Sequence, residues 1–175
     1  MSKRKLYKEG LEEYPLKGVI LGNIVMVAWV TVGTIGCWFL NPIIAWIYLA
    51  FALIMVGLVL RKLVCRGCYY YGKRCALGWG KLAALLSKRE DISKFGTGVG
   101  QKLAPITYGL LTLVPLVTII VSFFIDGLSI QKIIILIFLL SFSAYGSVVS
   151  RKVNCARCKM RFICPGSTAK QAPQP

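Results

Sequence analysis

Four long stretches without a charged residue constrain this chain more than any other feature of its sequence. They run over Gly18–Leu40, Ile43–Leu60, Leu103–Ile125 and Ile133–Ser150. The hydrocarbon core of a bilayer is about 30 Å thick, so a helix needs about 20 apolar residues to cross it. Lipid offers no hydrogen-bond partner to an open backbone, which favours helices over strands. The sequence therefore predicts an all-α integral membrane protein with four transmembrane helices.

The basic residues predict how this protein lies in its membrane. The chain has 22 Lys and Arg and a net charge of +16. Residues 1–17 carry five of these residues, residues 61–102 carry ten and residues 151–175 carry six, whereas the two other connections contain only Lys132. Positive residues mark the cytoplasmic side. We therefore expect a multi-pass protein of the cell membrane with both termini and the central loop in the cytoplasm. The basic side would face anionic lipid headgroups, and no motif for nucleic-acid binding is present.

Six of the seven cysteines form two similar motifs, which follow the second and fourth apolar stretches. The first reads VLRKLVCRGCYYYGKRC from Val59, and the second reads VVSRKVNCARCKMRFIC from Val148. Each has an Arg-Lys pair, two further residues, Cys-x2-Cys and a third cysteine, which follows after six residues in the first motif and five in the second. The first motif contains Cys65, Cys68 and Cys75, and the second contains Cys155, Cys158 and Cys164. We interpret the motifs as the ends of an internal repeat.

The repeat predicts two tandem helix hairpins with a cytoplasmic, cysteine-rich cap. Parallel copies related by an axis along the membrane normal would bring both motifs to one face of the bundle. We expect a cytoplasmic N-terminal segment (1–17), a first hairpin with its cysteine motif (18–78), a basic amphipathic linker (79–102), a second hairpin with its motif (103–165) and a disordered tail (166–175). Within the linker, WGKLAALLSK is typical of a short helix in the headgroup layer.

The cysteine spacing predicts a thiolate site. Cys-x2-Cys holds two thiolates on one side of a tight loop, as in metal sites and redox dithiols, and the reducing cytoplasm disfavours permanent disulfides. Zinc takes four ligands, which Cys65, Cys68, Cys155 and Cys158 could supply. An iron–sulfur cluster fits thiolate-only ligation equally well, and the second motif ends in Cys-Pro, as bacterial ferredoxin runs do. The third interpretation is thiol redox chemistry, in which nearby basic residues favour the thiolates.

Three functions follow from these interpretations. The first is a metal-binding membrane protein whose iron–sulfur or zinc centre serves electron transfer or redox sensing with a cytosolic or membrane partner. The second is a zinc-stabilised scaffold that docks a cytosolic protein or anionic lipid, and the third is a protein for thiol redox or soft-metal handling. Tyr69, Tyr70 and Tyr71 would form an interfacial belt, or stack on a cofactor and shield it from water.

Residue types that the sequence lacks narrow the choice among these functions. The chain has no histidine, no paired-carboxylate site and no charged residue at mid-membrane depth. These absences argue against a hydrolase and a proton-coupled transporter, so an enzymatic role would be that of a redox or electron-transfer subunit. Cys37 lies within the first apolar stretch, four residues after Gly33, a spacing suited to close helix packing.

The layout resembles that of membrane ferredoxin-type electron-transfer subunits, which also have four helices and cytoplasmic cysteine motifs. The resemblance concerns architecture and implies electron transfer through iron–sulfur clusters. Those proteins carry Cys-Pro in both motifs and usually longer cysteine runs, whereas the first motif here reads Cys75-Ala76. The chain is not assigned to that family.

Overall fold

The computed structural model describes residues 6–92, 95–96 and 98–169, and within these ranges it contains helices and turns and no strand. Four helices are long and apolar enough to cross a membrane, which confirms the prediction of four helices of membrane-spanning length. They are α1 (Leu16–Trp38), a composite helix over Pro42–Gly67, α5 (Val99–Asp126) and a composite helix over Ile130–Ala156. The first composite helix consists of α2 (Pro42–Ile54), η1 (Met55–Val59), α3 (Leu60–Val64) and η2 (Cys65–Gly67). The second consists of α6 (Ile130–Ala144), η4 (Tyr145–Ser150) and α7 (Arg151–Ala156).

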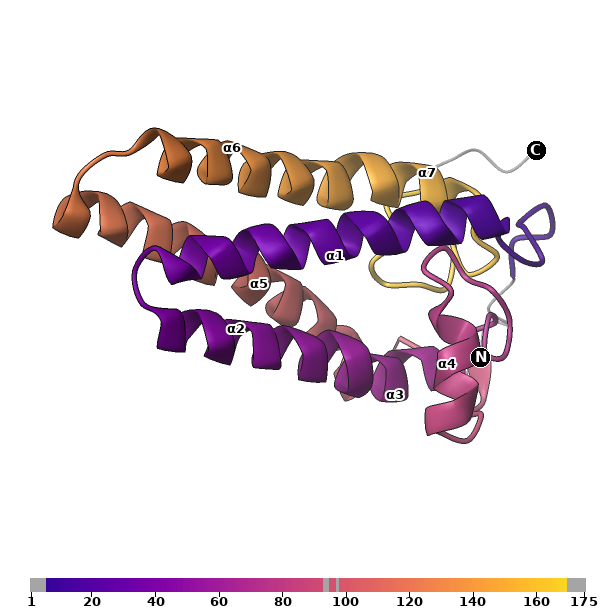
Figure 1. Ribbon diagram of the computed structural model, residues 1–175. Helices are drawn as coiled ribbons and strands as arrows, with labels where there is room; N and C mark the ends of the chain where they lie inside the picture. The colour runs from indigo at the N-terminus through magenta and orange to yellow at the C-terminus, as the bar shows by residue number, and fades with distance from the viewer. Residues whose placement is uncertain (1–5, 93–94, 97, 170–175) are drawn as a thin grey trace.

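Successive long helices run in opposite directions, so the ends of the bundle differ (Figure 1). The turns between α1 and α2 and between α5 and α6 lie at one end of the bundle. Both are short, and a polar side chain caps the helix that follows each turn. The Asn41 side chain accepts a hydrogen bond from the Ile43 amide (2.7 Å) and Ser129 caps α6 at the Lys132 amide (3.4 Å). The N-terminal segment, both cysteine motifs and the C-terminal segment lie at the other end.

Both composite helices extend beyond the apolar stretches from which they were predicted. The first continues to Gly67 and the second to Ala156, so Cys65 and Cys155 lie in the last helical turns. An apolar stretch marks only the part of a helix that lies in hydrocarbon. Helical backbone hydrogen bonding continues through both basic pairs, since Arg61 and Lys62 lie in α3 and Arg151 and Lys152 lie in α7.

The two composite helices have the same backbone irregularity at equivalent positions. Both are π-helical just before the basic pair, in η1 (Met55–Val59) and η4 (Tyr145–Ser150). The starts of these segments, 55 and 145, are 90 positions apart, as are Cys65 and Cys155. Single-turn π-helices are rare and are often found at functional sites. The similarity of the motifs thus extends back into the apolar part of each helix.

The core of the bundle lies where α1 packs against α2, α5 and α6. Gly33 and Gly36 of α1 allow close approach, to Tyr48 of α2 and Ile119 of α5 respectively. The Tyr48 hydroxyl donates a hydrogen bond to the Leu111 carbonyl of α5 (2.8 Å). Cys37 is fully buried in this core, in agreement with the packing role predicted for it.

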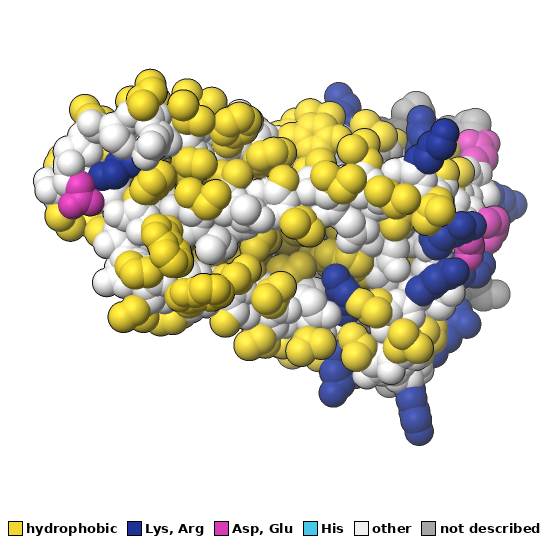
Figure 2. All heavy atoms as spheres, in the orientation of Figure 1, with side chains coloured by type: hydrophobic (Ala, Val, Ile, Leu, Met, Phe, Trp, Pro, Cys, Tyr) yellow, Lys and Arg dark blue, Asp and Glu magenta, His cyan; other side chains and the backbone are white. Residues whose placement is uncertain are grey.

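The outer surface of the bundle is apolar over most of its length (Figure 2). Large side chains such as Val27, Trp46 and Phe124 are 66%, 62% and 86% exposed. Such a surface is far larger than the apolar patches of soluble monomers, and it is the expected surface of helices in lipid. Lys and Arg side chains gather at the end that carries the cysteine motifs.

The short helix predicted in the central loop is present as α4 (Trp79–Leu86). Its inner face buries Trp79 and Ala83, and the Arg61 guanidinium of α3 lies 4.6 Å from the Trp79 ring centre. Its outer face exposes Leu82, Leu85 and Leu86. The helix is therefore amphipathic and is attached to the bundle at the level of the basic pair.

Candidate functional site at the cysteine end of the bundle

The two cysteine motifs have the same backbone turn. In the first, the Cys68 amide donates to the Cys65 carbonyl (3.2 Å), and in the second, Cys158 donates to Cys155 at the same distance. The next hydrogen bonds also correspond, from Tyr71 to Cys68 and from Arg161 to Cys158, both at 3.1 Å. Tyr70 and Met160, which occupy equivalent positions, are 2% and 1% exposed. The repeat read from the sequence is thus matched in backbone geometry.

The two turns pack on common hydrophobic clusters. Cys68 and Cys158 both contact a cluster of Tyr14, Val19 and Tyr70, and both contact a second cluster formed by Phe95, Met160 and Ile163. Three of the remaining motif cysteines contact these clusters or the core of the bundle. Cys75 contacts the first cluster, Cys164 contacts the second, and Cys65 and Cys75 contact the core of the bundle. The fold therefore brings both motifs to one end of the bundle. Cys68 and Cys158 are the two motif cysteines that contact both clusters.

The three tyrosines after Cys68 hold segments of the chain together. The Tyr70 hydroxyl donates to the Leu11 carbonyl (2.7 Å) and accepts from the Lys159 amide (3.1 Å), and its ring packs against Cys68 and Cys158. The Tyr69 hydroxyl donates to Glu12, and the Tyr71 hydroxyl donates to the Ser87 carbonyl. Their hydroxyls are thus engaged within the protein, while Tyr70 covers the thiols from one side.

The N-terminal segment lies across both motifs. Its backbone donates from Tyr7 to the Lys159 carbonyl (3.0 Å) and from Leu11 to the Arg157 carbonyl (2.9 Å), and Leu11 forms an isolated parallel bridge with Cys158. Its Tyr14 reaches both motifs, because the amide donates to the Arg74 carbonyl (2.9 Å) and the hydroxyl to the Asn154 carbonyl (2.7 Å). Residues 7–14, which we call the N-terminal clamp, thus form the third wall of the site.

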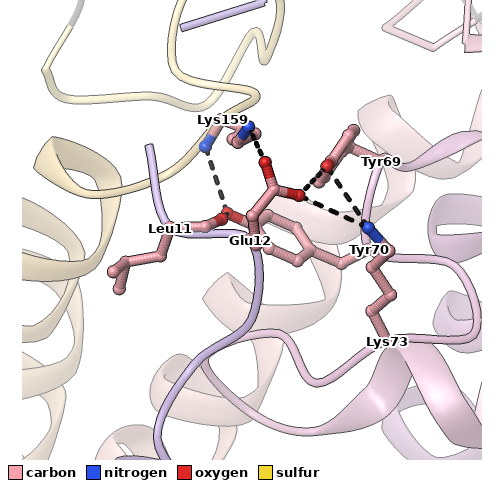
Figure 3. Close-up of polar contacts among 6 residues, drawn as sticks. All are labelled: Leu11, Glu12, Tyr69, Tyr70, Lys73 and Lys159. Atoms are coloured by element: carbon pink, nitrogen blue, oxygen red, sulfur yellow. Dashed lines mark hydrogen bonds and ion pairs between the residues drawn. The ribbon is translucent and has the colours of Figure 1, made fainter. Parts of the chain in front are cut away.

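Glu12 links the clamp to both motifs (Figure 3). Its carboxylate pairs with Lys159, accepts a hydrogen bond from the Tyr69 hydroxyl and lies 3.5 Å from the Lys73 ammonium. Its bond to Lys159, followed by that to Tyr69, lowers the pKa of Glu12 to about 2. The neighbouring Glu13 pairs with Arg74 (2.8 Å). Two adjacent carboxylates thus hold basic residues of the cysteine motifs.

The cysteines of the site are half-buried. Cys65, Cys68, Cys75, Cys155 and Cys158 are free cysteines. Burial raises the pKa of Cys68 and Cys158 above the ordinary value, and neighbouring thiols raise it further. Reactive cysteines have lowered pKa values, and burial shifts the pKa of Cys68 and Cys158 in the opposite direction.

Within the residues that the structure describes, no group of three or more His, Cys, Asp or Glu side chains is arranged to hold a metal ion. Thiolate donors suit soft or borderline metals such as zinc and iron in clusters. The donor chemistry thus fits a metal, although the described residues do not present three such donors together.

Comparisons of this chain with protein-family models, with curated proteins and with solved structures found no match.

Sequence reasoning identified the six cysteines and missed the clamp. All six lie at the same end of the bundle, as predicted, whereas Glu12, Tyr14 and Gly10 were not recognised. A signal was present in the composition, because three of the six acidic residues fall at Glu9, Glu12 and Glu13 in a chain with a net charge of +16. An acidic cluster near the start of such a basic chain indicates an internal contact with basic residues.

Proposed function

We propose that this chain is a membrane protein whose two cysteine motifs together bind a metal centre, either zinc or an iron–sulfur cluster. The observation that carries the proposal is that the two motifs share one backbone turn and pack Cys68 and Cys158 against the same residues. Two motifs built alike and brought together are expected where each supplies ligands to a common site. We further propose that the chain consists of two tandem hairpins and that the cysteine end forms a cap.

Electrostatics supports a cation among these thiols. Buried thiolates that lie close together repel one another and are destabilised by the loss of water, and a bound cation would offset both effects. Zinc would be held by two cysteines of each motif and would fix the two hairpins to each other. An iron–sulfur cluster bound by the same residues would instead supply one-electron redox chemistry.

The second candidate function is a scaffold, and the amphipathic helix α4 favours it. Its exposed leucines continue the apolar surface of the bundle, and Lys81, Lys88 and Arg89 lie in or just after it. Such a helix binds the boundary between headgroups and acyl chains. We propose that the bundle lies in the plasma membrane and that its basic end faces the anionic headgroups of the cytoplasmic leaflet. Both termini would then lie in the cytoplasm.

Labelling with a membrane-impermeant maleimide tests both the orientation and the metal. We expect the motif cysteines to remain unlabelled in intact cells, to be labelled after permeabilisation, and to react faster once a chelator has removed the metal. Cys37 should stay unlabelled throughout, because it is fully buried. Mass spectrometry of the labelled peptides gives the result for each cysteine.

The matched control is Leu128→Cys in the turn at the opposite end, where the side chain is 76% exposed. This cysteine should be labelled in intact cells. Labelling of the motif cysteines before permeabilisation, with Leu128→Cys protected, would show that the orientation is inverted. Labelling that does not change when metal is removed would contradict the metal centre.

A further inference from the structure

The clamp contacts the residues that directly follow the central cysteines. Lys159 follows Cys158 and Tyr69 follows Cys68, and the Glu12 carboxylate is bonded to both side chains. One carboxylate from a third segment of the chain thus joins the two cysteine turns (Figure 3).

The same carboxylate separates two like charges. The Lys73 ammonium of the first motif and the Lys159 ammonium of the second lie 4.6 Å and 5.3 Å from the centre of the same Tyr69 ring. Both ammonium groups pair with the Glu12 carboxylate, Lys159 directly and Lys73 at 3.5 Å. Without the negative charge of Glu12, two cations from different motifs would face each other without a counter-charge.

The backbone of the clamp approaches the second motif too closely for a side chain to intervene. A Cβ atom at Gly10 would lie 2.7 Å from the Lys159 amide nitrogen and 2.8 Å from its Cα. Backbone atoms cannot move aside as a flexible side chain can. Glycine at position 10 therefore permits this close backbone contact, and a larger residue would push the clamp away from the second motif.

We propose that Glu12 is a positioning residue for the thiol site, holding Cys68 and Cys158 next to each other through Tyr69 and Lys159. The clamp also covers this pair, so that its release would admit water, reagents and metal to the thiols. The inference deepens the proposed function, since the two cysteines belong to the proposed centre. The contacts that carry it are independent of any metal.

The test is a thiol cross-linking rate in the full natural chain, purified in lipid nanodiscs and treated with chelator. A short bis-maleimide is added, and the Cys68–Cys158 product is quantified by mass spectrometry. We expect this product in the natural chain. Glu12→Gln should form it about fivefold more slowly, which is near the upper limit for one exposed ion pair, while total labelling of the two thiols by a monofunctional maleimide should increase.

Three further variants separate positioning from general damage. Glu9→Gln is the matched control and should behave as the natural chain. The hydrogen bond that Glu9 accepts within the clamp comes from the Tyr7 hydroxyl and not from a cysteine motif. Glu12→Gln with Lys73→Gln should recover part of the cross-linking, because the repulsion between Lys73 and Lys159 is removed while the bonds to Tyr69 and Lys159 remain weakened. Gly10→Val should slow cross-linking with all charges intact.

The proposal is overturned if Glu12→Gln and Gly10→Val cross-link Cys68 to Cys158 at the rate of the natural chain, or if the natural chain forms no such product. It is also overturned if removal of Lys73 gives no recovery in a Glu12→Gln variant that still protects Cys37. Because the assay contains chelator, failure of metal binding does not alter these outcomes. Conversely, if the clamp proves not to position the two cysteines, the metal content of the natural chain is not affected by that result.

Discussion

Replacing Cys68 and Cys158 together by serine is expected to reduce bound metal to less than about one tenth of the content of the natural chain, because a thiolate centre would lose one ligand from each motif. These two cysteines lie against the same two hydrophobic clusters and are the members that both motifs bring together. Serine has nearly the same shape, so the packing of the clusters should survive. Metal content per protein, determined by mass spectrometry of the purified variant, gives the result.

Two other replacements define the ligand set. Cys37→Ser should retain all metal, since this cysteine is buried in the core of the bundle, away from the motifs. Cys75→Ser with Cys164→Ser distinguishes a four-thiolate zinc site, which would be retained, from centres that use all six motif cysteines. A Cys68→Ser, Cys158→Ser variant that binds metal as the natural chain does would contradict a shared centre.

Gly33→Val is expected to destabilise the bundle by about 1–3 kcal/mol, the usual cost of overpacking a close-packed core. A Cβ atom at this position would lie 2.8 Å from Tyr48 Cζ. The Tyr48 ring would have to move, and its buried hydrogen bond to the Leu111 carbonyl would be strained, at a further cost of about 1 kcal/mol. Reversible unfolding in mixed micelles, followed by circular dichroism, measures the change.

Gly109→Val in α5 is the matched control for this prediction. A Cβ atom there meets nothing within 4 Å, and the position faces outward on the same type of long apolar helix. Any effect of valine on the helix itself is therefore present in both variants. Equal stability of the two variants would contradict the packing of α1 on α2 that the structure gives.

The helices were predictable because lipid imposes a simple rule on sequence. A stretch such as Leu103–Ile125 contains no charge and no other structure can satisfy its backbone in hydrocarbon. The ends of the helices were less accessible to this reasoning. α5 begins at Val99 and the second long helix continues to Gly67, because helical hydrogen bonding persists through residues that the apolar count excludes.

The cysteines of the candidate site were predictable because their spacing is a local pattern that recurs after 90 residues. The clamp is different in kind. Glu12 lies 147 positions from Lys159 and 57 from Tyr69, and nothing in the immediate surroundings of Glu12 indicates either partner. Long-range ion pairs between single residues leave no periodic signal in one sequence, and only the unusual grouping of acids hinted at this contact.

The most direct test of the shared centre is metal analysis together with a visible spectrum of the natural chain purified without oxygen. The account predicts either iron with acid-labile sulfide and a broad brown absorption, or about one equivalent of zinc and no colour, as four thiolates from two motifs would bind. Iron would identify an electron carrier or redox sensor, and zinc a stabilised scaffold. Protein that contains neither metal, and that takes up neither after anaerobic reconstitution, would contradict the account.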